Sequence, residues 1–296
     1  MSLRQTLRGT GVALVTPFDS TGNIDYPALD QLIQEVISNG VEYVVTLGTT
    51  GETPTLSKQE KSDIILFTYK AVNHRVPVVV GVGGFNTQAV IEELNSLPLD
   101  QATAILSASP YYNKPSQEGI YQHYAAIADA SPKPVLLYNV PGRTGRNMTA
   151  ATTLRLANHA NIAGIKEASD NMMQALAILK DRADDFLVVS GDDGLCLPQI
   201  LCGMDGVITV AGNAFPKQFS DMVRAALEGN ATQALQLNNP LLEAYDLMFE
   251  ENNPAGIKAF LFEQGILQNE LRLPMVPLSE GVHQRIKAYL EVHQPA

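Results

Sequence analysis

The sequence predicts an α/β fold, a (β/α)8 TIM barrel with a small helical appendix at its C-terminal end. Short apolar runs alternate with longer helical patterns eight times in roughly the first 220 residues, which is the expected size of such a barrel. Parallel strands need a crossover helix between them, and this alternation provides one. From Gln218 onward only helical patterns remain. We therefore assign residues 1–217 to a catalytic barrel domain and residues 218–296 to a C-terminal helical domain.

Eight segments have the length and apolar character of buried strands. They are 12–15, 43–47, 77–82, 102–106, 134–138, 162–165, 186–190 and 206–210. Helices are predicted over 26–40, 57–74 and 117–130, with Asp25 and Ser57 as the first two N-caps. An open doubly wound sheet is the alternative architecture. Against it, no glycine-rich dinucleotide fingerprint follows the first strand.

The composition limits the classes of function. Hydrophobic residues make up 45% of the 296 residues, which is enough for a large core. The net charge of −11 and the lack of a basic run argue against nucleic acid or an anionic membrane as a partner. No apolar stretch approaches a membrane span, and no secretory signal is recognisable. Cys196 and Cys202 are expected to be buried thiols of a cytoplasmic enzyme, and the five histidines show no metal-ligand spacing.

The sixth predicted strand ends in a lysine, Lys166. An ammonium group at the end of a buried strand loses its hydration shell. Without a charged or polar partner, losing the proton costs less free energy than burying the charge. A neutral amine in an apolar setting is a nucleophile for carbonyl carbon. The alternative is a lysine that swings out to solvent or pairs with Glu167.

Other chemically capable residues follow the remaining strands. Active sites of (β/α)8 barrels lie at the carboxyl ends of the strands, so the fold predicts that most of these residues share one rim. In sequence order they are Thr49, Thr50, Tyr112, Tyr138, Arg143, Lys166 and Gly191.

Each of these residues has a structural and a functional interpretation. Thr49 and Thr50, flanked by glycines, form a tight turn or a carboxylate site. Tyr138 is a core tyrosine or a proton carrier. Arg143 is a solvated loop residue or a fork for a carboxylate. Tyr112 belongs to a subunit contact, a neighbour's site, or both. The segment 191–194 is interpreted as a structural turn without metal.

The assembled motifs resemble the dihydrodipicolinate synthases, a group within the pyruvate-dependent class I aldolase family. The resemblance covers nearly the whole length. It rests on Val15-Thr-Pro-Phe18, Gly48-Thr-Thr-Gly-Glu52, Pro110-Tyr-Tyr-Asn-Lys-Pro115, Tyr138-Asn-Val-Pro-Gly-Arg-Thr-Gly145, Gly164-Ile-Lys-Glu-Ala-Ser169, Gly191-Asp192, Asn253-Pro254 and Leu271-Arg-Leu-Pro-Met-Val-Pro-Leu-Ser279.

The resemblance implies a reaction in which Lys166 forms a Schiff base with pyruvate and the resulting enamine attacks aspartate 4-semialdehyde. It implies no separate cofactor and no metal, and the expected assembly is a homo-oligomer, a dimer or a tetramer, with the tetramer preferred. Thr49, Tyr138 and a neighbouring subunit's Tyr112 are the implied proton relay. Arg143 is the implied contact of the aldehyde's carboxylate, and the pyruvate contacts are Thr50, Ile208 and Gly191.

Related activities remain open alternatives. They are N-acetylneuraminate lyases, 2-keto-3-deoxy sugar acid aldolases and a binding protein built on the same barrel. Sialic acid lyases lack an arginine in the loop that carries Arg143, so this residue favours the synthase. One departure concerns feedback control. Family members inhibited by lysine carry histidines where this chain has Lys58 and Lys61, and two ammonium groups repel a cationic effector.

Overall fold

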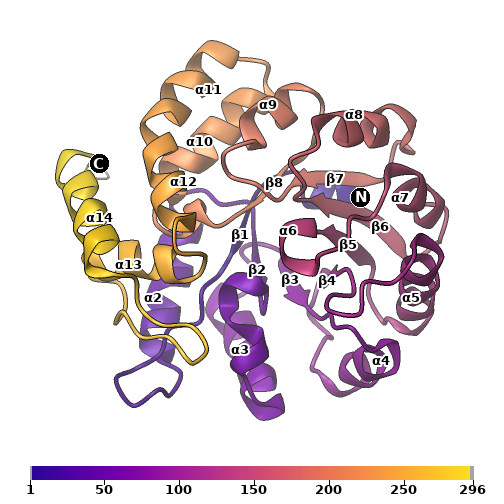
Figure 1. Ribbon diagram of the computed structural model, residues 1–296, viewed down its shortest axis with the longest axis horizontal. Helices are drawn as coiled ribbons and strands as arrows, with labels where there is room; N and C mark the ends of the chain where they lie inside the picture. The colour runs from indigo at the N-terminus through magenta and orange to yellow at the C-terminus, as the bar shows by residue number, and fades with distance from the viewer. Residues whose placement is uncertain (1, 294–296) are drawn as a thin grey trace.

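The computed structural model describes residues 2–293 and contains eight parallel strands closed into a barrel (Figure 1). Each strand pairs with the next one in the chain, and β8 pairs with β1 to complete the ring. This closure confirms the predicted fold class and excludes the open doubly wound sheet. The strands are β1 (Gly9–Ala13), β2 (Tyr43–Thr46), β3 (Val78–Gly81), β4 (Ala104–Ala108), β5 (Val135–Asn139), β6 (Ile162–Glu167), β7 (Leu187–Ser190) and β8 (Gly206–Thr209).

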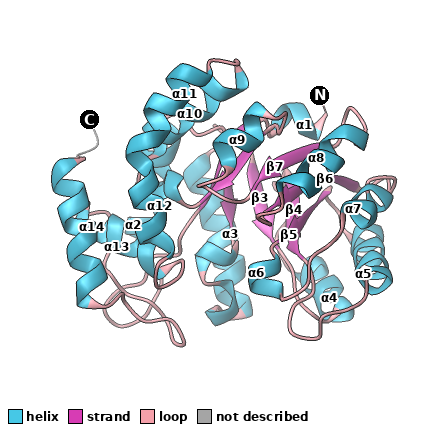
Figure 2. Ribbon diagram, turned by 45° about the horizontal axis from the view of Figure 1, so that its top comes forward, coloured by secondary structure: helices cyan, strands magenta, loops and turns pink. Residues whose placement is uncertain are grey.

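Helices surround the strands on the outside of the barrel (Figure 2). The barrel helices are α1 (Leu3–Thr6), α2 (Tyr26–Ser38), α3 (Lys58–Val72), α4 (Thr87–Ser96), α5 (Gln117–Ala130), α6 (Pro141–Thr144), α7 (Ala150–Leu156), α8 (Met172–Asp181), α9 (Cys196–Leu201) and α10 (Pro216–Leu227). The chain continues through α11 (Ala231–Asn238), α12 (Leu242–Phe249), α13 (Ala255–Glu263) and α14 (Glu280–Val292). Short 3-10 turns are η1 (Thr49–Gly51), η2 (Thr53–Thr55), η3 (Ala211–Asn213) and η4 (Asn239–Leu241).

The predicted helix starts are confirmed where capping residues signal them. The Asp25 carboxylate accepts a hydrogen bond of 3.0 Å from the Ala28 N–H at the start of α2. At α3, Ser57 and Glu60 form a reciprocal capping box. The observed bounds of α5 coincide with the predicted segment 117–130.

The strand bounds shift where glycine or polar residues extend the pairing. β1 begins at Gly9 rather than at Val12. A Cβ on Gly206 would lie 1.9 Å from the Gly9 carbonyl oxygen, so the first and last strands meet through glycines that carry no apolar signal. β4 likewise runs on to Ala108, past the apolar run predicted at 102–106.

One end of the barrel is closed by the N-terminal helix and by buried charges. Leu7, which follows α1, is fully buried in the barrel interior. Asp205, just before β8, accepts hydrogen bonds from the guanidinium groups of Arg4 and Arg182. This end is therefore packed, and the open cavity lies at the opposite end, where the strands finish.

Helix α10 packs on the barrel rather than on the C-terminal helices alone. The Arg224 guanidinium donates 2.7 and 2.6 Å hydrogen bonds to the Gly40 carbonyl and the Glu42 carboxylate of the barrel. The predicted division between residues 217 and 218 falls inside this helix, because α10 begins at Pro216. The assignment of two domains stays a prediction.

The two cysteines differ in environment. Cys196 is buried, as expected, but Cys202 is exposed, and the expectation for this thiol is wrong. Six helical positions separate the two residues, which is a rotation of about 240° around the helix axis. Since Cys196 faces the core, Cys202 at the end of α9 faces solvent.

Candidate active site

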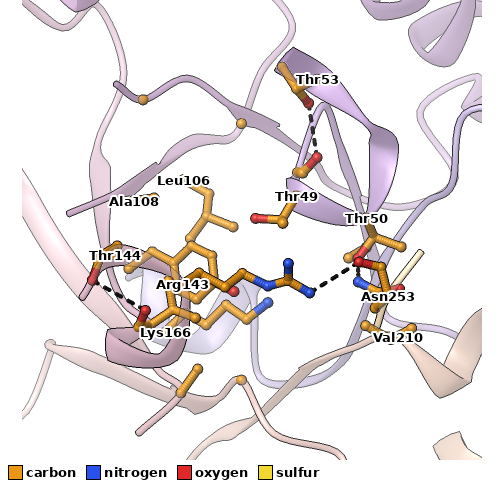
Figure 3. Close-up of a pocket in the computed structure, with 18 of the residues that line it drawn as sticks. Thr49, Thr50, Thr53, Leu106, Ala108, Arg143, Thr144, Lys166, Val210 and Asn253 are labelled. Carbon is orange, nitrogen blue, oxygen red and sulfur yellow. Dashed lines mark hydrogen bonds between the residues drawn. The ribbon is translucent and has the colours of Figure 1, made fainter. Parts of the chain in front are cut away.

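A cavity of about 870 Å³ opens at the carboxyl ends of the strands. Its walls come from the carboxyl ends of all eight strands, β1 to β8, and from the C-terminal helices. Figure 3 shows the side chains of Thr49, Thr50, Arg143 and Lys166 facing the same space. Six predicted site residues line it: Thr49, Thr50, Tyr138, Arg143, Lys166 and Gly191.

Lys166 extends from β6 into the cavity, although its side chain is almost fully buried. Its relative exposure is 5%. It pairs in register with Tyr138 of β5, and its Nζ lies 4.5 Å from the centroid of the Tyr138 ring. The structure therefore excludes the alternative in which the lysine swings out to solvent.

Gly191 makes space for the lysine at the end of β7. A Cβ at this position would lie 2.7 Å from Cε and 3.0 Å from Cγ of Lys166. Carbon atoms in contact are normally about 3.5–4.0 Å apart. The missing side chain of Gly191 is thus what allows the lysine to take this path.

Glu167 lies on the other face of β6 and does not pair with Lys166. Its fully buried carboxylate accepts hydrogen bonds from the side chains of Asn139 and Gln174 and a 2.8 Å bond from the Ser169 N–H. The side-chain oxygen Oδ1 of Asn139 accepts a 2.9 Å hydrogen bond from the Met148 N–H. This network fixes the two ends of the loop that carries Arg143.

Thr50 lies in a short 3-10 turn after β2 and is buried. Its hydroxyl oxygen accepts a 3.0 Å hydrogen bond from the side-chain amide of Asn253. Leu47, which leads into this turn, has a positive φ of 56°. A Cβ on Gly81 would lie 2.1 Å from the Leu47 carbonyl oxygen, so glycine is required on β3 for the turn to adopt this position.

Arg143 reaches across the cavity from α6 (Figure 3). One of its guanidinium nitrogens donates to the Asn252 side-chain oxygen at 3.1 Å and to the Asn253 carbonyl at 3.2 Å. The remaining N–H groups can donate to a carboxylate, since a guanidinium carries five donors in a planar fork.

Two predicted residues do not line the cavity of this chain. Tyr112 is 86% exposed and contacts Phe85, with ring centroids 6.3 Å apart. Its loop carries it outward, so within one chain it cannot join a relay with Tyr138. Ile208 is fully buried in the barrel interior below the cavity, and Val210 forms the wall at the tip of β8 instead.

The pair Asp192 and Asp193 follows β7 at the cavity wall. Asp193 accepts hydrogen bonds of 3.0 and 2.7 Å from the backbone N–H groups of Val210 and Ala211. Burial nevertheless raises the pKa of its carboxyl to about 6. These contacts join the tips of β7 and β8, which agrees with the structural interpretation of this segment.

Several cavity residues were missed by the sequence reasoning. Tyr245, Asp246 and Phe249 come from α12, and Glu250 and Asn253 follow it. In the sequence, Asn253 stands out only through the Asn253-Pro254 motif, to which no role was assigned. Asn253 follows Thr50 by 203 residues in the sequence, and no local sequence pattern indicates that their side chains are in contact.

Among residues 2–293, no group of three His, Cys, Asp or Glu side chains could hold a metal ion. Within the same described range, no helix combines the length and the hydropathy that a membrane crossing requires.

The closed barrel and the buried lysine at its strand ends define a (β/α)8 enzyme of the class I aldolase type. The model of the dihydrodipicolinate synthetase family matches residues 6–293, and the chain belongs to this family.

Relatives with known names are similar over almost their whole length. The 4-hydroxy-tetrahydrodipicolinate synthase of Azobacteroides pseudotrichonymphae is 51% identical over 285 residues, which are 96% of each chain. That of Phocaeicola vulgatus is 49% identical over 97% of each chain. Among solved structures, the dihydrodipicolinate synthase of Aquifex aeolicus has a TM-score of 0.93 and 35% identity, covering 97% of this chain and 98% of its own.

Proposed function

We propose that this protein condenses pyruvate with aspartate 4-semialdehyde to give 4-hydroxy-tetrahydrodipicolinate, a precursor of lysine and diaminopimelate. The observation that carries the proposal is the position of Lys166, buried beside Tyr138 in a cavity that also contains Arg143. The names of the full-length relatives support the same reaction.

The first half of the reaction activates pyruvate. The neutral Lys166 amine attacks the ketone carbon, and the carbinolamine loses one water to form an imine. Loss of a proton from the methyl group then gives an enamine. The Lys166 Nζ lies in the cavity beside the Tyr138 ring, where it can meet the ketone carbon of a bound keto acid.

The second half joins the two substrates. The enamine carbon attacks the aldehyde carbon, and the aldehyde oxygen takes up a proton. The amino group of the semialdehyde then attacks the imine carbon and displaces the lysine amine, which closes the ring and regenerates Lys166. No oxidant and no separate cofactor is needed, so the covalent Schiff base is the only activation that the proposal requires.

Side chains at the cavity have separate roles in this proposal. Thr50 and the Gly191 backbone hold the pyruvate, and Ile208, whose side chain packs below the cavity, would come near it only through its backbone. Thr49 and Tyr138 move protons to and from the carbinolamine, with Tyr112 supplied by a neighbouring subunit. The exposure of Tyr112 is compatible with this arrangement, since an 86% exposed tyrosine is free to enter another chain's site.

Arg143 is assigned to the carboxylate of the second substrate. Its guanidinium lies in the same cavity as Lys166, and it has N–H groups beyond those used by the Asn252 and Asn253 contacts. This residue favours the synthase over an N-acetylneuraminate lyase, and a 2-keto-3-deoxy sugar acid aldolase is the alternative that a comparison of co-substrates separates. The lysine, tyrosine and threonine set also argues against a non-catalytic binding protein.

The proposed setting is a homotetramer in the cytoplasm. The assembly is proposed because the relay includes a neighbour's Tyr112, and the location because the reaction serves amino-acid biosynthesis.

A co-substrate comparison tests the function. The protein is given pyruvate with aspartate 4-semialdehyde, N-acetylmannosamine or glyceraldehyde, and consumption of each aldehyde is followed. We expect rapid turnover only with the semialdehyde and none in Lys166→Ala. Preferred turnover of either sugar-derived aldehyde would contradict the proposal.

A further inference from the structure

A buried ion pair links the C-terminal helices to the threonine turn. Lys258, on α13, has a fully buried side chain, and Glu52 directly follows η1 with 1% side-chain exposure. The Lys258 Nζ and the Glu52 Oε1 are 2.5 Å apart. Neither residue lines the cavity, and neither has a role in the reaction proposed above.

The surroundings hold this pair in one arrangement. Lys258 also donates to the Glu270 carbonyl at 2.8 Å, and its Nζ lies 4.2 Å from the centroid of the Phe18 ring. The other carboxylate oxygen of Glu52 accepts a 3.1 Å hydrogen bond from the backbone N–H of Arg272. Burial lowers the pKa of Lys258 to about 8, although the Glu52 carboxylate opposes this shift.

Such a pair specifies geometry more than it adds stability. Burying both charges costs solvation free energy that is close in size to the free energy gained from their attraction. A mutation that deletes only one partner leaves the other charge buried and uncompensated. The pair therefore restricts α13 and the segment after η1 to arrangements in which the Lys258 ammonium contacts the Glu52 carboxylate.

Glu52 passes this restriction to the threonine turn. It has a positive φ of 51°, which is uncommon for a residue with a side chain. Its N–H donates to the Thr49 carbonyl at 3.2 Å, and its own carbonyl accepts from the Thr55 N–H at 2.9 Å. The backbone of Thr49 and Thr50 is thus fixed relative to the carboxylate that Lys258 holds.

A second contact from the same C-terminal segment reaches this turn. Asn253, five positions before Lys258, donates to the Thr50 hydroxyl at 3.0 Å. Segment 253–258 therefore contacts the threonine turn twice. Asn253 contacts it from the cavity side, and Lys258 contacts it through the ion pair with Glu52.

We propose that Lys258 is a positioning residue that acts through Glu52 to hold the Thr49–Thr50 turn in the geometry that binds the carboxylate of the keto acid. The C-terminal helices are then part of the keto-acid site rather than an appendix. This inference rests on the proposed function, because it concerns the pyruvate site of that reaction.

A purely structural role would have a different signature. If the pair only attaches the C-terminal helices, its removal lowers stability and leaves the folded protein's response to pyruvate unchanged. If it positions the turn, the pyruvate concentration that half-saturates Schiff-base formation rises. This concentration is measured by trapping with borohydride at increasing pyruvate, without the second substrate.

The test compares Lys258→Met with the variant Glu52→Gln/Lys258→Met, which lacks both charges of the pair. We expect the half-saturating pyruvate concentration to rise about tenfold in both, which corresponds to about 1.4 kcal/mol of binding. Lys258→Arg keeps the charge and should recover part of this loss. Arg182→Met is the matched control, because it breaks a buried pair with Asp205 at the closed end of the barrel.

The outcomes separate this inference from the function itself. In the control we expect a lower Tm and an unchanged half-saturating concentration. An unchanged value in folded Lys258→Met or in the double variant overturns the inference, and so does a failure of all three Lys258 variants to fold, which would make the pair a stability element. If the wild-type protein is not labelled by pyruvate, the proposed function fails and this inference fails with it.

Discussion

Alanine at Gly191 tests whether the path of the reactive lysine is set by a missing side chain. The new Cβ would lie 2.7 Å from the Lys166 Cε and 2.6 Å from the Ala168 Cβ. Ordinary carbon contacts are about 3.5–4.0 Å, so the lysine stem must move by about 1 Å. The φ of Gly191 is not in the left-handed region, and alanine therefore adds a steric effect without backbone strain.

We expect Gly191→Ala to slow Schiff-base formation more than it lowers the stability of the fold. Adding a methyl group to a packed site costs about 1–3 kcal/mol, which lowers the Tm by several degrees in a chain of this size. A displacement of about 1 Å at a reacting group costs on the order of 100-fold in rate. We expect Gly191→Ala to be folded and to form the pyruvate Schiff base about 100 times more slowly.

The assay is borohydride trapping at saturating pyruvate, with thermal unfolding measured in parallel. Gly281→Ala is the control, since a Cβ at that position meets nothing within 4 Å. If folded Gly191→Ala is trapped within twofold of the wild-type rate, the reasoning about this site is wrong.

Four further predictions concern other parts of the chain. Arg143→Met should raise the KM for aspartate 4-semialdehyde about tenfold or more and change that for pyruvate less, and equal changes in both would contradict its assignment. Glu167→Gln should lower the free energy of unfolding by about 1–3 kcal/mol, because an amide N–H₂ would face the donors that now surround the carboxylate; an unchanged urea midpoint would disprove this. The Arg272 guanidinium lowers the pKa of Glu60 to about 2, so this carboxylate stabilises the fold above its unfolded pKa of about 4.5 and loses that effect as the pH falls toward 2. The Tm difference between wild type and Glu60→Gln should therefore be largest near pH 6 and shrink toward pH 3, whereas a constant difference would refute the linkage. Free lysine should inhibit weakly or not at all, because Lys58 and Lys61 repel a cation, and half-inhibition at sub-millimolar lysine would contradict this.

Much of the barrel could be predicted because its pattern is local. Each buried strand is a short apolar run, and each of the helices that were predicted begins at a capping residue such as Asp25 or Ser57. The short helices α7 and α9, with 7 and 6 residues, were not assigned individually because they are too short for a clear periodicity.

The six cavity residues could also be predicted, because parallel strands place their carboxyl ends at one rim. What the sequence could not predict are contacts between distant segments. Asn253 meets Thr50, and Lys258 meets Glu52, only after α12 and α13 fold back on the barrel. Tyr112 is a different case, since its exposed side chain needs another chain for its proposed role.

The proposed function depends above all on the capture of a keto acid by Lys166 as a Schiff base. The most direct measurement is peptide mapping by mass spectrometry after incubation with pyruvate and borohydride. We expect one reduced pyruvyl group on Lys166, and we expect the label to disappear in Lys166→Ala. Label on another residue, or unchanged label in that variant, would contradict the account.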